Sequence, residues 1–258
     1  MRRRTFLIAG TVAATAAMAG CRLLETDGPP VMPSAPPGDE RLIRQFSAAR
    51  GRTVDFYTAV PAGHGDGRGL PVCFVLHGGS KRPADFAGVG LGRFLTDAVR
   101  RGAAPFVLAG ATGDRLAWKP HGDDDPQRMV HEELPAWCAA RGFDTSRLAA
   151  WGWSMGGSGA LLLAETFPGF VRSVAAFSPA VARGDAVFDG AARLAGTKIG
   201  LWCGRDDNLY DNVYALKKAL PAPPVAGAYR DGRHNFTYWS TAIPSAFDFI
   251  AATLTDPR

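Results

Sequence analysis

The sequence predicts a single α/β domain in which a mainly parallel sheet is covered by helices on both faces. The first observation is that short, continuously apolar runs alternate with helix-length segments, as in parallel strands joined by crossover helices. The second is composition: 258 residues, 47% apolar and 21% charged, are typical of a globular protein and exclude wholesale disorder, collagen-like repeats and coiled coils. The third is that no internal repeat or second domain is visible in the chain.

Continuous apolar runs predict strands that are buried on both faces of the sheet. A weaker run at 225–229 predicts a sixth strand, and the more alternating run at 53–60 predicts a strand at the sheet edge. Asp125 followed by Pro126 is a helix start signal, an N-cap residue before a proline. The five strong runs are 70–76, 106–111, 147–153, 171–177 and 198–203, and helices are expected at 91–101, 126–141, 155–167, 212–220 and 239–254.

The N-terminus has the pattern of an export signal. Residues 2–7 read Arg-Arg-Arg-Thr-Phe-Leu, a twin-arginine pair followed by apolar residues, and the run 6–20 carries no charge. At about fifteen residues this run is shorter than the ~20 needed to span a bilayer. Residues 1–20 are therefore predicted to be a Tat-type signal peptide, and the alternative is an N-terminal membrane anchor.

Two cleavage sites compete after this run. The sequence Met-Ala-Gly-Cys ending at Cys21 resembles a lipobox, and lipid modification of Cys21 would hold the protein at the outer face of the cytoplasmic membrane or in the cell envelope. Residues 17–19 instead fit an A-x-A site, which predicts a secreted protein. Five prolines between residues 25 and 40 predict an extended tether over 21–40, which favours the lipid anchor, and a folded domain over 41–258.

Charge and cysteine content limit the expected partners. The net charge of +5 falls to 26 basic against 24 acidic residues once residues 1–20 are removed, so no nucleic-acid partner is inferred. Cys73 and Cys203 lie in apolar runs, where a cysteine behaves as a small hydrophobe. Together with Cys138 they show no C-x-x-C spacing, so no metal or other cofactor is expected, and an oxidising compartment leaves a disulfide open.

A G-x-S-x-G motif surrounds Ser154, between a predicted buried strand and a predicted helix. In this context the motif forms a tight turn that lifts the serine hydroxyl above the sheet edge, and the helix N-terminus adds a positive dipole. We therefore predict that Ser154 is a nucleophile. The alternative is that Ser154 only caps the following helix.

A serine hydroxyl needs a base that takes its proton and an acid that orients this base. With this motif the chain order is serine, acid, histidine, and His234 is the one histidine that follows Ser154. The acid is expected after the strand that ends at Cys203, where a Gly-x-x-Asp spacing selects Asp207, with Asp206 and Asp211 as alternatives. The sequence assigns His131 to a solvated helix face and His64 to a surface loop.

An oxyanion hole needs two N–H donors. The amide of Met155, directly after the predicted nucleophile, is expected to be one of them. The loop after strand 70–76 reads His-Gly-Gly-Ser, beginning at His77, and its glycines leave the backbone open to a developing oxyanion. Gly79 is the preferred second donor and Ser80 the alternative, and His77 is predicted to be a structural residue of this loop.

Over residues 50–254 the chain resembles the α/β-hydrolases of the esterase D type, in particular exported actinobacterial esterases and, more distantly, the secreted mycolyltransferases of mycobacteria. Mycolyltransferases carry Asp-Gly-Leu in the oxyanion loop and a glutamate as third triad member, where this chain has His77-Gly-Gly and Asp207. These departures favour an esterase. The resemblance lies in Leu-His-Gly-Gly at 76–79, Gly-Trp-Ser-Met-Gly-Gly at 152–157, Leu-Trp-Cys-Gly at 201–204 and His-Asn-Phe-Thr-Tyr-Trp at 234–239.

The sequence thus predicts an exported serine carboxylesterase that hydrolyses short- to medium-chain acyl esters of small molecules or lipids through an acyl-enzyme on Ser154. The alternatives are an acyltransferase that passes the acyl group to an alcohol, a peptidase, and a non-catalytic surface lipoprotein on the same fold. Residues 118–125 either line the cleft, bind a cation or form a polar loop with Asp125 as a helix cap. Phe236, Tyr238 and Trp239 either wall an acyl pocket or pack the last helix.

Overall fold

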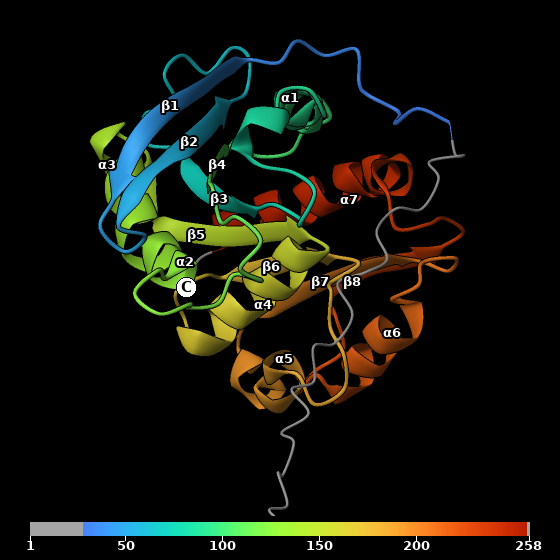
Figure 1. Ribbon diagram of the computed structural model, residues 1–258. Coiled ribbons are helices and arrows are strands. Elements are labelled where there is room, and N and C mark those ends of the chain that lie inside the picture. Colours follow the sequence, from blue (N-terminus) through green and yellow to red (C-terminus); the bar gives the residue numbers. More distant parts are fainter. Residues whose placement is uncertain (1–27, 257–258) are drawn as a thin grey trace, which may run out of the picture.

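Eight strands form one sheet within residues 28–256, the part of the chain that the computed structural model describes. The predicted signal peptide and Cys21 lie outside this part. The strand order is β1-β2-β4-β3-β5-β6-β7-β8; β2 runs antiparallel to both of its neighbours, and all later pairs are parallel (Figure 1). The strands are β1 (Asp39–Ser47), β2 (Arg52–Val60), β3 (Pro71–Leu76), β4 (Val107–Ala111), β5 (Asp144–Trp153), β6 (Ser173–Phe177), β7 (Lys198–Gly204) and β8 (Ala226–Arg230).

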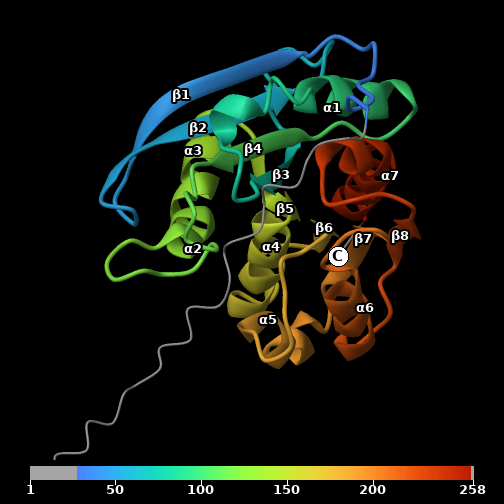
Figure 2. The same ribbon diagram turned by 45° about the vertical axis from the view of Figure 1, so that its right-hand side comes forward.

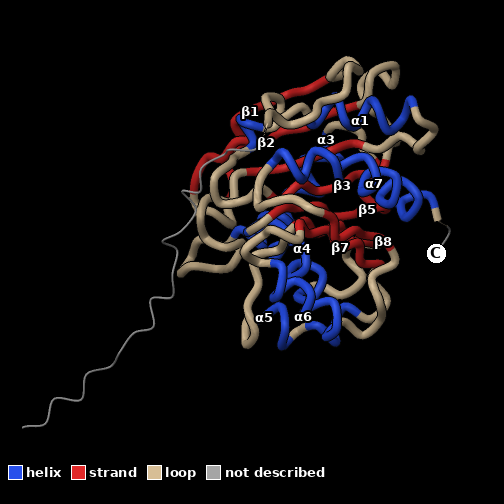
Figure 3. The backbone as a smooth tube through the Cα atoms, turned by 90° about the vertical axis from the view of Figure 1, so that its right-hand side faces the viewer, coloured by secondary structure: helices blue, strands red, loops and turns tan. Residues whose placement is uncertain are grey.

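Helices cover both faces of this sheet, as Figures 2 and 3 show. One face carries α1 and α7, and the other carries α2 to α6. The predicted α/β class, a mainly parallel sheet covered on both sides in a single domain, is confirmed. The helices are α1 (Leu91–Arg100), α2 (Pro126–Arg128), α3 (Leu134–Ala140), α4 (Met155–Thr166), α5 (Ala186–Asp189), α6 (Tyr210–Ala219) and α7 (Phe236–Thr255).

The central strands are apolar at every position because each side chain enters one of two cores. In β3, Phe74 and Leu76 pack toward α4, whereas Cys73 and Val75 pack toward α1 and α7. All four side chains are buried. A parallel strand that is covered on both faces has no solvated side, so its sequence cannot alternate between apolar and polar residues.

The N-terminal part of the domain differs from the sequence expectation. Strand β1 is not predicted by the sequence, the domain boundary expected at residue 41 falls inside it, and β1 rather than the 53–60 segment forms the sheet edge. Most side chains of β1 are exposed or half-buried, and charged residues interrupt its apolar ones. The sequence of β1 therefore shows neither the alternation of a half-buried strand nor the ~3.6-residue period of a helix. Only its pairing with β2 identifies it as a strand.

The helix expected over 126–141 is interrupted by a π-turn at Met129–Glu133. Pro135 lies in the first turn of α3, where its ring would clash with the carbonyl group four residues earlier in a regular α-helix, and a wider turn avoids this clash. Within this turn, His131 is half-buried and stacks on Phe167 with ring centroids 3.7 Å apart, so the expectation of a solvated histidine is wrong. Within residues 28–256, no helix has the length and hydropathy needed to cross a membrane.

Candidate active site

Ser154 is the single residue between the end of β5 and the start of α4. Its backbone has φ 54° and ψ −123°, a strained conformation for a residue other than glycine. The flanking glycines make this turn possible. A Cβ at Gly156 would lie 1.8 Å from the Leu76 carbonyl oxygen, and one at Gly152 would lie 2.2 Å from the Gly156 carbonyl oxygen. The motif therefore forms the tight strand-to-helix turn that the sequence predicts.

His234 connects Ser154 to Asp207 by hydrogen bonds. The Nε2 atom of His234 lies 2.8 Å from Ser154 Oγ, and its Nδ1 lies 2.8 Å and 3.0 Å from the two carboxylate oxygens of Asp207. Asp207 is only 5% exposed, and its Oδ1 also accepts the backbone N–H of Leu209 at 2.9 Å. An ionised carboxylate can only accept a hydrogen bond, so Nδ1 carries the ring proton and donates it to this bond, and Nε2 is left as an acceptor for the serine hydroxyl.

The two alternative carboxylates lie elsewhere. Asp206 is exposed, its Oδ2 accepts the backbone N–H of Gly232 at 3.2 Å, and its own N–H donates to the Gly232 carbonyl oxygen at 3.0 Å. Asp206 therefore joins the loop after β7 to the loop that carries His234. Asp211 is exposed in the first turn of α6. Of the three candidates, the structure brings Asp207 into contact with the imidazole.

Gly79 lies close to the side chain of Met155, the residue that follows Ser154. Met155 is the first residue of α4, where backbone N–H groups have no carbonyl partner within the helix. A Cβ at Gly79 would meet only the Met155 sulfur, at 4.0 Å, whereas one at Gly78 would lie 2.8 Å from the Trp153 ring. Gly79 is half-buried and Ser80 is exposed. The backbone at Gly79 thus faces open space close to the first turn of α4.

Buried hydrogen bonds fix the loop that contains Gly79. His77 Nε2 accepts the backbone N–H of Gly113 at 2.9 Å, and its Nδ1 lies 2.9 Å from the Gly78 carbonyl oxygen. Burial lowers the pKa of His77, which keeps the ring neutral and able to accept. Trp118 packs edge-on against His77, with ring centroids 5.1 Å apart, and its Nε1 donates to the His77 carbonyl oxygen at 3.1 Å. His77 therefore joins the loops after β3 and β4.

Arg50, which no motif singles out, holds the loop after β4. Its buried guanidinium pairs with Asp114 at 2.8 Å and with Asp124, and donates to the Thr112 carbonyl oxygen. Asp125 caps α2 by accepting the backbone N–H of Arg128 at 2.9 Å. Residues 118–125 thus form a structural polar loop, as one of the three interpretations expects. In the described part of the chain, no three metal-ligating side chains converge on one point.

The aromatic residues after His234 divide between packing and the rim of the site. Trp239 is buried, donates from Nε1 to Ser178 Oγ at 3.0 Å and contacts the His234 ring edge-on, with centroids 4.9 Å apart. The Tyr238 hydroxyl donates to the Ala228 carbonyl oxygen at 3.2 Å. Phe236 is half-buried against Trp153, with ring centroids 5.2 Å apart. Tyr238 and Trp239 therefore pack α7, and Phe236 lies at the rim.

The described cysteines do not form disulfides. Cys73, Cys138 and Cys203 are all buried thiols. Cys203 lies at the end of β7, close to Asp207, and burial raises the pKa of its thiol to about 12. A thiol with such a pKa is protonated at neutral pH and is therefore a poor nucleophile.

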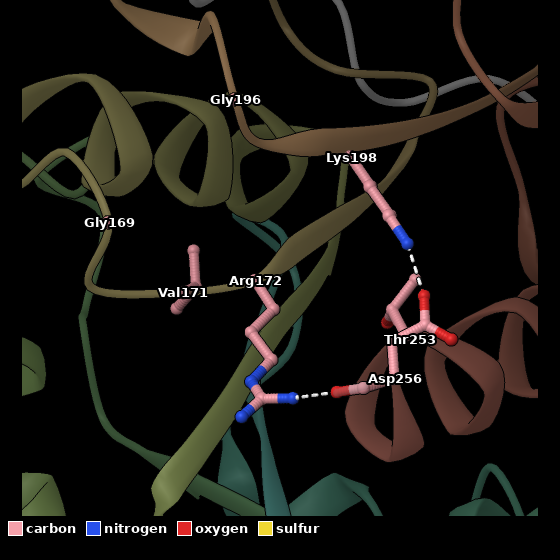
Figure 4. A pocket seen from close by; sticks show the side chains of 7 residues that line it. All are labelled: Gly169, Val171, Arg172, Gly196, Lys198, Thr253 and Asp256. Carbon is pink, nitrogen blue, oxygen red and sulfur yellow. Dashed lines mark hydrogen bonds and ion pairs between the residues drawn. The ribbon is translucent and has the colours of Figure 1, made fainter. Parts of the chain in front are cut away.

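Two cavities lie at the amino-terminal ends of the parallel strands, whereas Ser154 lies at the carboxyl-terminal end of β5. One, of about 240 Å³, is lined by residues at the starts of β6 and β7 and at the end of α7 (Figure 4). There Arg172 donates to the Asp256 carbonyl oxygen, and Lys198 pairs with the Asp256 carboxylate. The other, of about 280 Å³, lies at the starts of β7 and β8. Neither cavity includes a residue of the site around Ser154.

A strained serine turn on a mainly parallel sheet is typical of α/β-hydrolases, and so are a carboxylate and a histidine on the loops after later strands. The fold and the site therefore place the protein in this class. A family model described as "Putative esterase" matches residues 47–250, and the chain belongs to this family. The comparison therefore supports a hydrolase of esterase type. No curated protein sequence matches the chain.

Several solved structures share this fold. A ferulic acid esterase superposes with a TM-score of 0.73 at 19% identity, covering 83% of this chain and 97% of its own. An S-formylglutathione hydrolase from Agrobacterium tumefaciens gives 0.68 at 19% identity, covering 87% and 98%. MPT51 from Mycobacterium tuberculosis gives 0.64 at 15% identity, covering 84% and 99%. At these identities the likeness establishes the fold, and the expected resemblance to esterases and, more distantly, to the mycolyltransferases of mycobacteria is confirmed.

Proposed function

We propose that the protein is a serine carboxylesterase in which Ser154, His234 and Asp207 form the catalytic triad. The observation that carries this proposal is the unbroken hydrogen-bond chain from Asp207 through His234 to Ser154, with a 2.8 Å contact at each step. As Ser154 Oγ bonds to the ester carbonyl carbon, His234 Nε2 takes the hydroxyl proton. Asp207 holds the Nδ1–H and stabilises the imidazolium that forms.

The Gly79 and Met155 amides then stabilise the oxyanion of the tetrahedral intermediate. The bond from the carbonyl carbon to the leaving oxygen breaks, and His234 gives its proton to the departing alcohol. Water attacks the acyl-enzyme with His234 again as base, which releases a carboxylic acid and restores the Ser154 hydroxyl. No cofactor enters this scheme.

We infer that water rather than an alcohol is the normal acyl acceptor. A transferase must bind its alcohol well enough to compete with water at ~55 M, which needs a dedicated polar subsite. Residues 118–125 offer the polar side chains for such a subsite, but Asp124 is paired with Arg50 and Asp125 caps α2. Hydrolysis of short- to medium-chain acyl esters is therefore the proposed reaction.

Replacing Ser154 by alanine tests the nucleophile. Turnover of p-nitrophenyl esters of graded chain length should fall by a factor on the order of 10⁴–10⁶, with little change in thermal stability. Ser158→Ala, one turn further along α4, is the matched control and should retain activity. Full activity in a folded Ser154→Ala variant would contradict the assignment. If millimolar trehalose or glycerol instead yields mainly acylated alcohol, the reaction is transfer.

We also propose that the twin-arginine segment exports the protein and that Cys21 carries the lipid anchor. Two acyl chains anchor a protein stably at a membrane, whereas one does so only marginally. Cys21→Ala should therefore shift the exported protein from the membrane fraction to the soluble fraction, measured by immunoblot and by esterase activity. A wild-type protein found soluble in the medium and beginning at Gly20 would contradict lipid anchoring.

A further inference from the structure

Residues 28–38, which we name the strap, cross from the start of α7 to α1 before β1 begins (Figure 2). The Thr237 hydroxyl donates to the Gly28 carbonyl oxygen at 2.7 Å, and the Val31 N–H donates to Ser240 Oγ at 3.1 Å. Further along the strap Ala35 is buried, and its carbonyl oxygen accepts a hydrogen bond from Arg93 of α1 at 3.0 Å. These contacts fix the path of a segment whose sequence alone predicts an extended tether.

The carboxyl ends of the parallel strands, which carry Ser154, Asp207 and His234, form the side of the sheet that we name the catalytic edge. The first residue of the strap lies beside this catalytic edge. Thr237, which binds Gly28, is in the first turn of α7 and follows His234 by three residues. From Cys21 to Gly28 the chain advances seven residues, which span at most about 25 Å. A lipid on Cys21 would therefore hold the catalytic edge, rather than the opposite edge, close to the membrane.

The strap also exposes apolar side chains at this edge. Val31 is 67% exposed and Met32 is 49% exposed, and the Met32 side chain lies against Gly90 at the start of α1. Lys81 and Arg82, in the loop directly after the oxyanion glycines, add positive charge to this edge. Exposed apolar side chains and basic residues at the same edge of the sheet match the interfacial region of a bilayer that contains anionic lipids.

We propose that the strap holds the catalytic edge against a lipid surface and that the substrates are acyl esters presented by this surface. The proposal rests on the proposed esterase function and on the proposed lipid anchor at Cys21, and it narrows the substrate class of the esterase to lipid esters. Its physical basis is that Val31 and Met32 lose contact with water when they enter the interface, while the short chain to Cys21 keeps Ser154 near the acyl esters of the bilayer.

The test measures the wild-type exported protein on two substrates: a fluorogenic long-chain ester in phosphatidylglycerol–phosphatidylcholine vesicles, and p-nitrophenyl acetate in solution. Val31→Asp should lower the rate on the vesicle-borne ester by about tenfold and leave the soluble ester unchanged within about twofold, because a buried charge opposes insertion. Val225→Asp is the matched control. Val225 is 66% exposed and lies just before β8, at the opposite edge of the sheet, so both rates should stay at the wild-type level.

The outcomes separate this proposal from the proposed function. If Val31→Asp and Val225→Asp have equal rates on vesicles, or if the wild type cleaves the soluble ester but not the vesicle-borne one, the lipid-surface proposal fails and the esterase stands. If the wild type cleaves neither ester, the esterase function itself fails. A second variant, Met32→Asp, should repeat the selective loss of Val31→Asp, and equal loss on both substrates would indicate damage to the site instead.

Discussion

The two sides of Ser154 are held in place by different kinds of contact. On the oxyanion side, His77 and Trp118 are buried and connect the loops after β3 and β4 through uncharged hydrogen bonds. On the side of the base, the loops after β7 and β8 are connected at the surface. There Asp206 accepts the Gly232 N–H, and an exposed ion pair joins Arg205 to Asp231 at 3.6 Å.

This difference matches the demands of the two halves of the proposed reaction. Oxyanion donors stabilise charge only if they are already oriented, and buried hydrogen bonds in a low-dielectric interior provide such rigidity. Exposed ion pairs are screened by solvent and contribute little. On the base side, positioning therefore depends on the one buried carboxylate, Asp207. Damage there should impair proton transfer and leave the fold intact, whereas damage on the oxyanion side should change both geometry and stability.

The largest effect expected from this comparison concerns Asp207. Asp207→Asn should lower kcat/KM by roughly 10²–10⁴, because the neutral amide no longer fixes the Nδ1–H tautomer of His234 and cannot stabilise the positive charge of the imidazolium. Asp206→Asn, the adjacent control, should cost less than about tenfold, since it retains an oxygen for the Gly232 N–H. Both variants should unfold near the wild-type temperature in a thermal melt. A larger loss in Asp206→Asn would transfer the role of the acid to Asp206.

A smaller effect, of about tenfold in kcat with little change in KM, is expected for His77→Gln. The glutamine cannot satisfy both the Gly113 N–H and the Gly78 carbonyl oxygen in the same geometry, so the Gly79 amide moves from its position in the proposed oxyanion hole. Stability should also fall by about 1–3 kcal/mol in urea unfolding, as for other buried polar groups that lose a partner. His64→Gln, in a surface loop, serves as the control. Unchanged kcat and stability in His77→Gln would refute the positioning role.

The same variant should change the pH dependence of stability. Burial lowers the pKa of His77 below its ordinary value of about 6.5. As the pH falls below about 6.5, His77 therefore becomes protonated in the unfolded chain before it does so in the folded protein. The contribution of the uncharged His77 ring to folding stability is complete above pH ~6.5 and is lost as the pH falls below this value. Wild-type stability should therefore decrease more steeply than that of His77→Gln between pH ~6.5 and 5. Parallel curves would show that His77 titrates alike in both states.

Much of the fold could be predicted because its signals are local. The continuous apolar runs, such as β3, mark strands buried on both faces, and the glycines around Ser154 mark a turn that larger residues would block. Strand β1 carries no such signal, because its identity comes from pairing with β2 rather than from a buried face. The π-turn before α3 could not be predicted in the same way. The helical periodicity of residues 126–141 predicts one continuous helix and carries no sign of the clash that Pro135 would cause in it.

For the site, the sequence by itself determined the residue types, their chain order and the strand ends that carry them. Motif spacing is a local property, and parallel strands bring their carboxyl ends to one edge in any case. Only the tertiary structure decided which of Asp206 and Asp207 contacts His234, that His77 joins two loops through buried hydrogen bonds, and that the strap crosses from the start of α7 to α1. These contacts connect residues distant in sequence, and their geometry depends on side-chain direction and burial, which spacing along the chain does not encode.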